Sequence, residues 1–262
     1  MKRIMLIAAA ACCAANLSFA QNNKNEVMQL GDDNTSLVAQ EGLQNISVVL
    51  QTGNENESDV EQEGVWNDSY VDQIGNSNEA EVTQIGDQSH SEVEQTGSDN
   101  RAIVGQSGDF HSSDVTQTGW LNFAIAAQTG YSHESDIFQT GDDNKSFVTQ
   151  VGYVHVSHAE QTGNANNSGV GQYGDEHFSH VLQEGDWNYS GVIQVGNDNW
   201  STVDQLGNGN YNYVEQDGDH NISQVDQIGD ANFSFTEQLG NAHTNTTTQI
   251  GTFNVSNVQQ TN

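Results

Sequence analysis

Polar and hydrophobic residues follow one another along this chain in a phrase of eleven residues that repeats without a change of register. If the glutamine that opens the phrase is offset 0, offset 5 is Asn in 15 of 21 phrases, offset 7 is Ser in 16 and offset 9 is Val in 16. The glutamine itself recurs at every eleventh position from Gln29 to Gln260. Offsets 5, 7, 9 and the next 0 lie two residues apart, so a β-strand would place them on one face.

The four offsets of this face carry no Asp, Glu, Lys or Arg in any phrase, which predicts a dry inner face. Each of the first 21 glutamines is followed two residues later by Gly, and Asp or Asn commonly comes next. Glycine adopts the positive φ of a tight turn, and we expect the Asp or Asn beside it to tolerate the left-handed region. Each phrase therefore predicts a short strand and a tight turn. The candidate turn glycines are Gly31, Gly53, Gly75, Gly97 and Gly119.

Alternate phrases differ at offset 5, which indicates that the true unit has 22 residues. One series is Asn throughout, whereas the other holds all five His of this offset together with Ser89 and four Asn. We therefore predict an all-β fold, a parallel in-register β-solenoid of about ten 22-residue strand-turn-strand rungs. Stacked rungs would place each residue roughly 4.8 Å from its own copy, as in cross-β amyloid.

Buried glutamine and asparagine side chains are costly unless they are hydrogen-bonded, because an unpaired amide loses its water. In a stack each amide can bond the amides above and below it, so we expect continuous ladders that support assembly. The glutamines of one series are Gln29, Gln51, Gln73, Gln95, Gln117, Gln139, Gln161, Gln183, Gln205, Gln227 and Gln249. The asparagines of the same series are Asn34, Asn56, Asn78, Asn100, Asn122, Asn144, Asn166, Asn188, Asn210, Asn232 and Asn254.

Four histidines of the other series, His111, His133, His155 and His177, fall in one column on successive rungs. We interpret them as replacements for Asn at the corner of the rung. A metal site or a pH switch is the alternative, since imidazole binds metals and titrates near neutrality.

Residues 1–20 have the layout of a secretory signal peptide. Lys2 and Arg3 form a positive start, residues 4–15 are apolar, and residues 18–20 form a small-x-small cleavage site. The apolar stretch is too short to span a bilayer. We predict a signal peptide at 1–20, a short N-terminal spacer at 21–28 and the repeat solenoid at 29–262.

The formal net charge of −31 at pH 7 narrows the range of partners. It disfavours nucleic acid, whose phosphates need cations, and anionic membrane surfaces. In-register stacking would align Glu92, Asp114 and Asp136 in one column, where their carboxylates repel one another. Physiological salt screens this repulsion only beyond roughly 8 Å. We therefore expect faster assembly at mildly acidic pH or with divalent cations.

The repeat resembles that of curlin, the subunit of bacterial curli, which is usually written Ser-x5-Gln-x-Gly-x2-Asn-x-Ala-x3-Gln. Residues 89–106 match this motif in full, from Ser89 through Gln95, Gly97 and Asn100 to Gln106. The resemblance covers residues 29–262. Elsewhere the Ala slot is usually Ser, and the Ser slot is Asn or His.

This resemblance implies a secreted functional amyloid that assembles end to end with copies of itself into cell-surface fibres of a biofilm matrix. It also implies export through a curli-type secretion pore, a nucleator as partner, and a role in assembly for the inward Gln and Asn. The same resemblance implies no cofactor.

Two other functional classes compete with the fibre. A soluble secreted β-solenoid that binds calcium or a surface ligand, as in adhesins or ice-binding proteins, is the alternative. Calcium-binding RTX repeats use nine-residue Gly/Asp phrases rather than eleven with Gln and Val, and the threonines at offset 1 make only a partial row. An enzyme is not expected, because the rungs lack long loops and no nucleophile–base constellation stands out.

Overall fold

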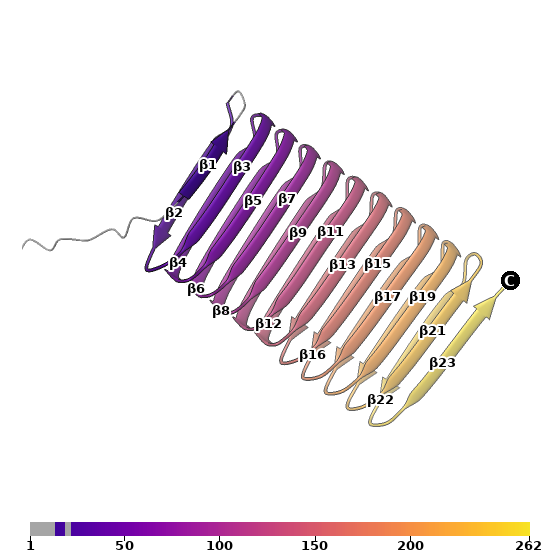
Figure 1. Cartoon of the computed structure of the whole chain (residues 1–262). Coiled ribbons are helices and arrows are strands. Elements are labelled where there is room, and N and C mark those ends of the chain that lie inside the picture. Colours follow the sequence, from indigo (N-terminus) through magenta and orange to yellow (C-terminus); the bar gives the residue numbers. More distant parts are fainter. Residues whose placement is uncertain (1–13, 19–21) are drawn as a thin grey trace, which may run out of the picture.

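The computed structural model describes residues 14–18 and 22–262. These residues form two parallel β-sheets that face each other, and the strands of both sheets stack along one common axis (Figure 1). Odd-numbered strands make a twelve-stranded sheet and even-numbered strands an eleven-stranded sheet. The first contains β1 (Ala14–Ser18), β3 (Thr35–Leu43), β5 (Glu57–Val65), β7 (Glu79–Asp87), β9 (Arg101–Asp109), β11 (Phe123–Tyr131), β13 (Lys145–Tyr153), β15 (Asn167–Asp175), β17 (Tyr189–Asn197), β19 (Tyr211–Asp219), β21 (Phe233–Leu239) and β23 (Val255–Thr261). The second contains β2 (Lys24–Leu30), β4 (Ile46–Asn54), β6 (Asp68–Asn76), β8 (His90–Ser98), β10 (Ser112–Trp120), β12 (Glu134–Asp142), β14 (Val156–Thr162), β16 (Phe178–Glu184), β18 (Trp200–Leu206), β20 (Ile222–Ile228) and β22 (Thr244–Ile250).

The register between neighbouring strands is constant. Each residue pairs with the residue 22 positions further along the chain, as in Gln95↔Gln117↔Gln139. Strand direction is parallel in every pair of the described strands, which confirms the all-β, parallel in-register solenoid. The eleven-stranded sheet contributes one strand to each rung, so β2 to β23 form eleven rungs where about ten were expected.

The solenoid begins before the first complete eleven-residue phrase, because β2 already pairs with it. β2 begins at Lys24, inside the expected spacer at 21–28, and pairs with β4 in the same 22-residue register. β1 lies within the segment interpreted as a signal peptide and pairs with β3. The positive start and residues 19–20 of the cleavage site lie outside the described residues, so the signal peptide stays a prediction. Among residues 14–18 and 22–262, no helix is long and apolar enough to cross a membrane.

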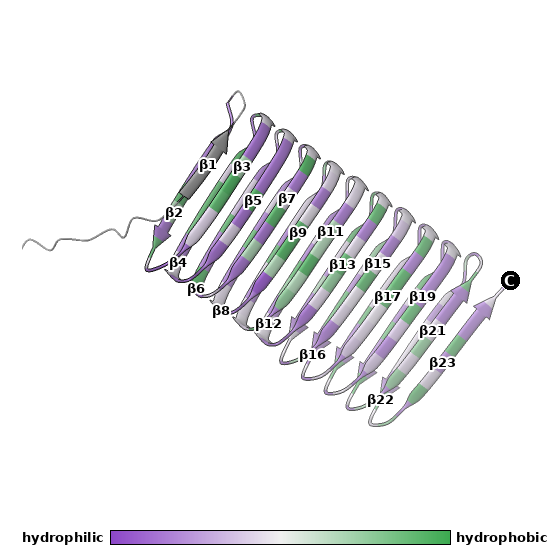
Figure 2. Ribbon diagram, viewed as in Figure 1, coloured by the Kyte–Doolittle hydropathy of each residue, from purple (hydrophilic) through white to green (hydrophobic). Residues whose placement is uncertain are grey.

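The core is a thin layer between the two sheets. Hydrophobic and hydrophilic residues alternate along the strands (Figure 2), and the valines at offset 9 face inward, with Val71 and Val93 0% exposed. The serines at offset 7 from Ser36 to Ser234 are also buried, including Ser146, whose neighbour in β11 is Ala124. Small side chains at both offsets let the two sheets approach closely, because a close-packed interior leaves no room for voids.

The turn between strands differs from our expectation. Positive φ occurs at the glycine of offset 2 and again at offset 4, not at the Asp or Asn of offset 3. Offset 4 accepts bulky residues, with φ of 65° at Trp66, 62° at Phe110 and 54° at Val154. Side chains other than glycine adopt this region at a cost of order 1 kcal/mol. The stacked backbone of the turn therefore imposes the conformation.

The Asp or Asn at offset 3 instead forms a ladder along the row of turns. The Trp120 N–H donates to Asp142 Oδ1 at 3.1 Å, and the Asp142 N–H donates to Asn164 Oδ1 at 3.1 Å. The Asn164 N–H in turn donates to Asp186 Oδ1 at 2.8 Å. A side-chain acceptor at this offset satisfies the backbone N–H of the preceding rung, which explains why Asp and Asn are frequent there.

Gly119→Ala should weaken the solenoid strongly. Gly119 has φ of +128°, and a Cβ there would lie 2.0 Å from the carbonyl oxygen of Gly141 on the next rung. We expect a loss of about 2 kcal/mol or more in the free energy of unfolding, measured by denaturant titration followed by circular dichroism. Gly105→Ala is the control, because a Cβ there has no atom within 4 Å. Equal effects of the two substitutions would contradict this account of the turn.

Ser146→Ala should stabilise the solenoid. Ser146 is 0% exposed, and its hydroxyl is buried without a hydrogen-bond partner in the described structure. Removing an unsatisfied hydroxyl should raise the free energy of unfolding by about 1 kcal/mol. Ser223→Ala is the contrast, since Ser223 Oγ accepts a hydrogen bond of 3.4 Å from Asn245 Nδ2. Denaturation curves in which both variants lose stability equally would refute the prediction.

Candidate functional site

Glutamine side chains form two ladders of hydrogen bonds that run the length of the stack. In each, Nε2 of one glutamine donates to Oε1 of the glutamine 22 residues later, at 2.6 Å from Gln29 to Gln51 and 2.8 Å from Gln95 to Gln117. The predicted series, Gln29 to Gln249, makes one ladder. The alternate series, from Gln40 to Gln260, makes the other with the same geometry. Our prediction covers only the first series, although the constant eleven-residue spacing applies equally to both.

From Gln40 to Gln260, the second N–H of each glutamine donates to a backbone carbonyl of the opposite sheet. Gln117 Nε2 in β10 donates to the backbone carbonyl of Arg101 in β9 at 3.0 Å, in addition to its bond to Gln139 Oε1. Gln117 is fully buried, so both N–H groups are satisfied without water. Each glutamine thus links its rung to the next and one sheet to the other.

Asparagine at offset 5 joins the turn to the following rung. Asn122 Nδ2 donates to the carbonyl of Gly141 at 2.7 Å, and Asn122 Oδ1 accepts the backbone N–H of Asn144 at 3.0 Å. This corner differs from the simple amide ladder that we expected. Side-chain bonds between successive asparagines occur at both ends of the series, as from Asn78 Nδ2 to Asn56 Oδ1 at 3.1 Å. At Asn144, Asn166 and Asn188, the bond to the preceding Oδ1 comes from the backbone N–H.

The histidine column at the opposite corner accepts the same backbone N–H as asparagine does, but its second nitrogen lies beside a carbonyl of its own turn. His133 Nδ1 accepts the backbone N–H of His155 at 3.1 Å, and His133 Nε2 lies 3.0 Å from the carbonyl oxygen of Thr129. The rings of His133 and His155 stack with centroids 4.8 Å apart. Because Nδ1 accepts, Nε2 carries the proton, and both nitrogens are occupied. A buried neutral ring with two partners has no free nitrogen for a metal ion.

Burial shifts the titration of these histidines. Desolvation, together with the neighbouring imidazoles of the column, lowers the pKa of His133 and of His155 to about 4. The pKa values of His111 and His177 are also lowered by burial. The column is therefore neutral at pH 7.

The outer face of the eleven-stranded sheet carries the predicted acidic column. Glu92, Asp114 and Asp136 lie at paired positions of β8, β10 and β12, which confirms that they stack. Burial, and then the negative charge of Asp136, raise the pKa of Asp114. Asp204 stacks on Asp226 in the same way, and burial raises its pKa. Protonation of these carboxyls therefore relieves a repulsion that the fold builds in.

These features define a class of protein: a parallel in-register β-solenoid whose rungs are joined by buried side-chain ladders. The Curlin associated repeat family matches residues 31–64, 53–86, 92–119, 122–152 and 180–207. Because these segments cover more than half of the chain, the chain belongs to the curlin family. That family is structural rather than enzymatic, and the fold fits a curli-like structural subunit. A comparison with curated proteins finds no match.

Replacing the four column histidines by Asn should remove an acid sensitivity of the fold. The pKa of such a histidine falls from 6.5 in the unfolded chain to about 4 in the folded chain. Between these pH values the unfolded state therefore binds more protons than the native state. The free energy of unfolding therefore falls as the pH drops from about 6.5 toward 4. At pH 5 His133 and His155 each contribute about 2 kcal/mol to this loss, so the variant should exceed the wild type by about 4 kcal/mol or more relative to their difference at pH 7.5.

Denaturant titrations at both pH values measure this difference. Asn fits the corner, because Asn199 continues the same column with its backbone N–H bonded to His177 Nδ1 at 3.2 Å. His220→Asn, at an exposed turn, is the matched control. If the variant and the wild type change in parallel with pH, the histidines do not limit acid stability.

Proposed function

We propose that this chain is the structural subunit of extracellular, curli-like functional-amyloid fibres that serve in a biofilm matrix, in surface adhesion and in cell aggregation. One observation carries the proposal: the rungs of the solenoid repeat along its axis. Each internal rung therefore presents the same backbone edge and the same buried amides to the rung that follows it. A second copy aligned end to end could continue both glutamine ladders. Membership of the curlin family supports the same conclusion.

The ends of the stack are the surfaces through which such fibres would grow. Within the described residues, β23 has a neighbour, β21, on one side only, and β22 likewise pairs only with β20. A strand edge of this kind presents backbone N–H and C=O groups that can pair with another chain. Val258 continues the inward column of Thr236 at this edge. We infer that the next subunit docks on the strand edge of this last rung and continues its inward columns.

The family resemblance supports a further proposal about export and nucleation. We propose that the chain leaves the cell unfolded through a curli-type secretion pore and that a nucleator starts the fibre. The inward Gln and Asn would then form their ladders during assembly outside the cell. The chain would act without a cofactor and without catalysis.

Purified full-length chain should form fibres on incubation. We expect thioflavin fluorescence to rise with a lag that seeds abolish, and aligned fibres to give reflections near 4.8 Å along the axis and near 10 Å across it. A chain that stays monomeric, with the same circular dichroism and no cross-β reflections, would refute the proposal. That outcome would favour a soluble secreted solenoid.

Val258→Asp should block growth at the C-terminal edge, whereas Val255→Asp should not. Both residues lie on β23, but Val258 occupies the inward column and Val255 points outward, with 76% of its surface exposed. A carboxylate sealed into a subunit junction lacks a partner and is strongly unfavourable. We expect seeded elongation by Val258→Asp to slow at least tenfold, measured by thioflavin fluorescence. Equal elongation rates for the two variants would place the docking face elsewhere.

A further inference from the structure

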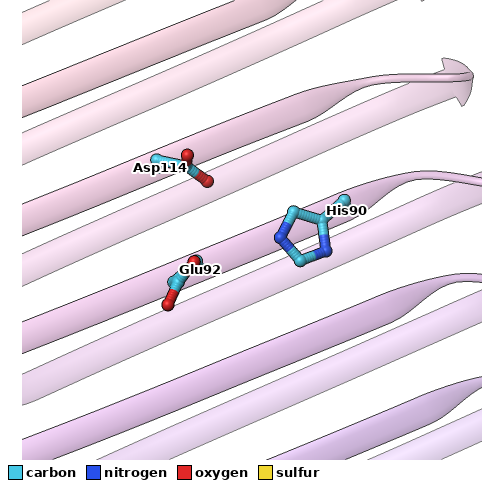
Figure 3. A group of neighbouring side chains, drawn as sticks. All are labelled: His90, Glu92 and Asp114. Carbon is cyan, nitrogen blue, oxygen red and sulfur yellow. The ribbon is translucent and has the colours of Figure 1, made fainter.

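Two groups of metal-ligating side chains lie on the outer face of the eleven-stranded sheet, away from the buried ladders. The first combines His90 and Glu92 of β8 with Asp114 of β10 (Figure 3). The second combines Glu134 and Asp136 of β12 with His158 of β14. In each group one ligand atom from every residue lies within 4.8 Å of the others.

The two groups occupy equivalent positions in the repeat. Each takes offsets 6 and 8 of one strand and offset 8 of the next strand in the sheet. Each contains one imidazole and two carboxylates, with the histidine at offset 6 in the first group and at the far offset 8 in the second. The 22-residue register therefore builds the same three-ligand arrangement twice, with its ligands permuted. Asp114 and Asp136 are paired neighbours, so the groups adjoin.

The first group contains a buried carboxylate oxygen without a hydrogen-bond partner among the described residues, and the second contains a close nitrogen–oxygen pair. Asp114 Oδ1 is buried, and the described residues give it no hydrogen-bond partner, although Glu92 and Asp136 flank it. In the second group, His158 Nδ1 already lies 2.7 Å from Asp136 Oδ2. A buried carboxylate oxygen without a donor, between two further acids, is unfavourable unless a cation compensates it.

We propose that each group binds one divalent transition-metal ion, with Zn²⁺ as its representative. Zn²⁺ accepts imidazole nitrogen and carboxylate oxygen at about 2.0–2.2 Å, and sites with three protein ligands leave a fourth position for water. Ca²⁺ takes six to eight oxygen ligands and does not favour imidazole. Ligand atoms around tetrahedral zinc lie about 3.4 Å apart, so small side-chain rotations close each group on the ion.

The bound ion would join neighbouring rungs on the outside of the solenoid. The first site bridges β8 and β10, and the second bridges β12 and β14. Each ion would also offset the repulsion within the acidic column. This inference concerns the folded chain and does not depend on fibre formation, so its test separates from that of the proposed function.

Other histidine–acid contacts on the surface supply controls. His220 Nε2 lies 3.3 Å from Asp198 Oδ2, and His180 Nδ1 lies 3.9 Å from Asp204 Oδ1, but neither pair belongs to a three-ligand group of the described residues. Asp59 and Glu81 stack at offset 8 of the other sheet without a histidine ligand. Substituting both removes two carboxylate charges, as the combination of the two site variants does, without removing a chelating group.

The test is calorimetric titration of ZnCl₂ into the folded full-length chain at pH 7, with the fold verified by circular dichroism. We expect two ions per chain, falling to one for His90→Gln with Asp114→Asn and to one for Asp136→Asn with His158→Gln. The combination of all four substitutions should bind none with comparable affinity. Asp59→Asn with Glu81→Gln, and separately His220→Asn, should leave both sites intact. CaCl₂ should bind the wild type at least tenfold more weakly than ZnCl₂.

Three results would overturn the proposal. These are unchanged zinc stoichiometry in both site variants, equal loss of binding in the Asp59/Glu81 control, and calcium affinity equal to that for zinc. The last comparison uses the wild type alone, so it decides the question even if a variant fails to fold.

Discussion

The structure depends on one constraint: a side-chain amide sealed between two sheets must find partners for every N–H it carries. Gln117 meets it with one bond along the stack and one across to the opposite sheet. Both partners exist only if each rung repeats its neighbour residue for residue. An inserted or deleted residue would break two ladders at once, which explains why the glutamine register never slips between Gln29 and Gln260.

The corners of the rung obey the same rule with more chemical freedom. What the corner requires is an acceptor for the next backbone N–H and a donor for a nearby carbonyl. Asn122 supplies these from an amide, and His133 supplies them from the two nitrogens of a neutral imidazole. Histidine is therefore tolerated inside the stack, where burial lowers its pKa.

The outer faces carry no such constraint, so their composition varies from rung to rung. In-register stacking nevertheless turns every outward residue into part of a column. Tyr189, Tyr211 and Phe233 stack as aromatic rings, with centroids 4.7 and 5.1 Å apart. Acids at offset 8 stack in the same way and meet histidines from the neighbouring offset or rung. A repetitive interior can thus present varied surfaces, which suits a fibre that must be uniform inside and adaptable outside.

Sequence alone determined the alternation of faces, the 22-residue unit and the parallel register, because the pattern is strict and periodic. It also located the Gln and Asn columns and the stacking of Glu92, Asp114 and Asp136. Only the tertiary structure decided where the left-handed turn residue lies, since stacked backbone imposes that conformation on Trp66 or Val154 regardless of side chain. Only it revealed that glutamine also bonds across the sheets. The proximity of His90 to Glu92 and Asp114 likewise became visible only in the structure, because the period of the sequence does not give the distances between side chains of neighbouring columns.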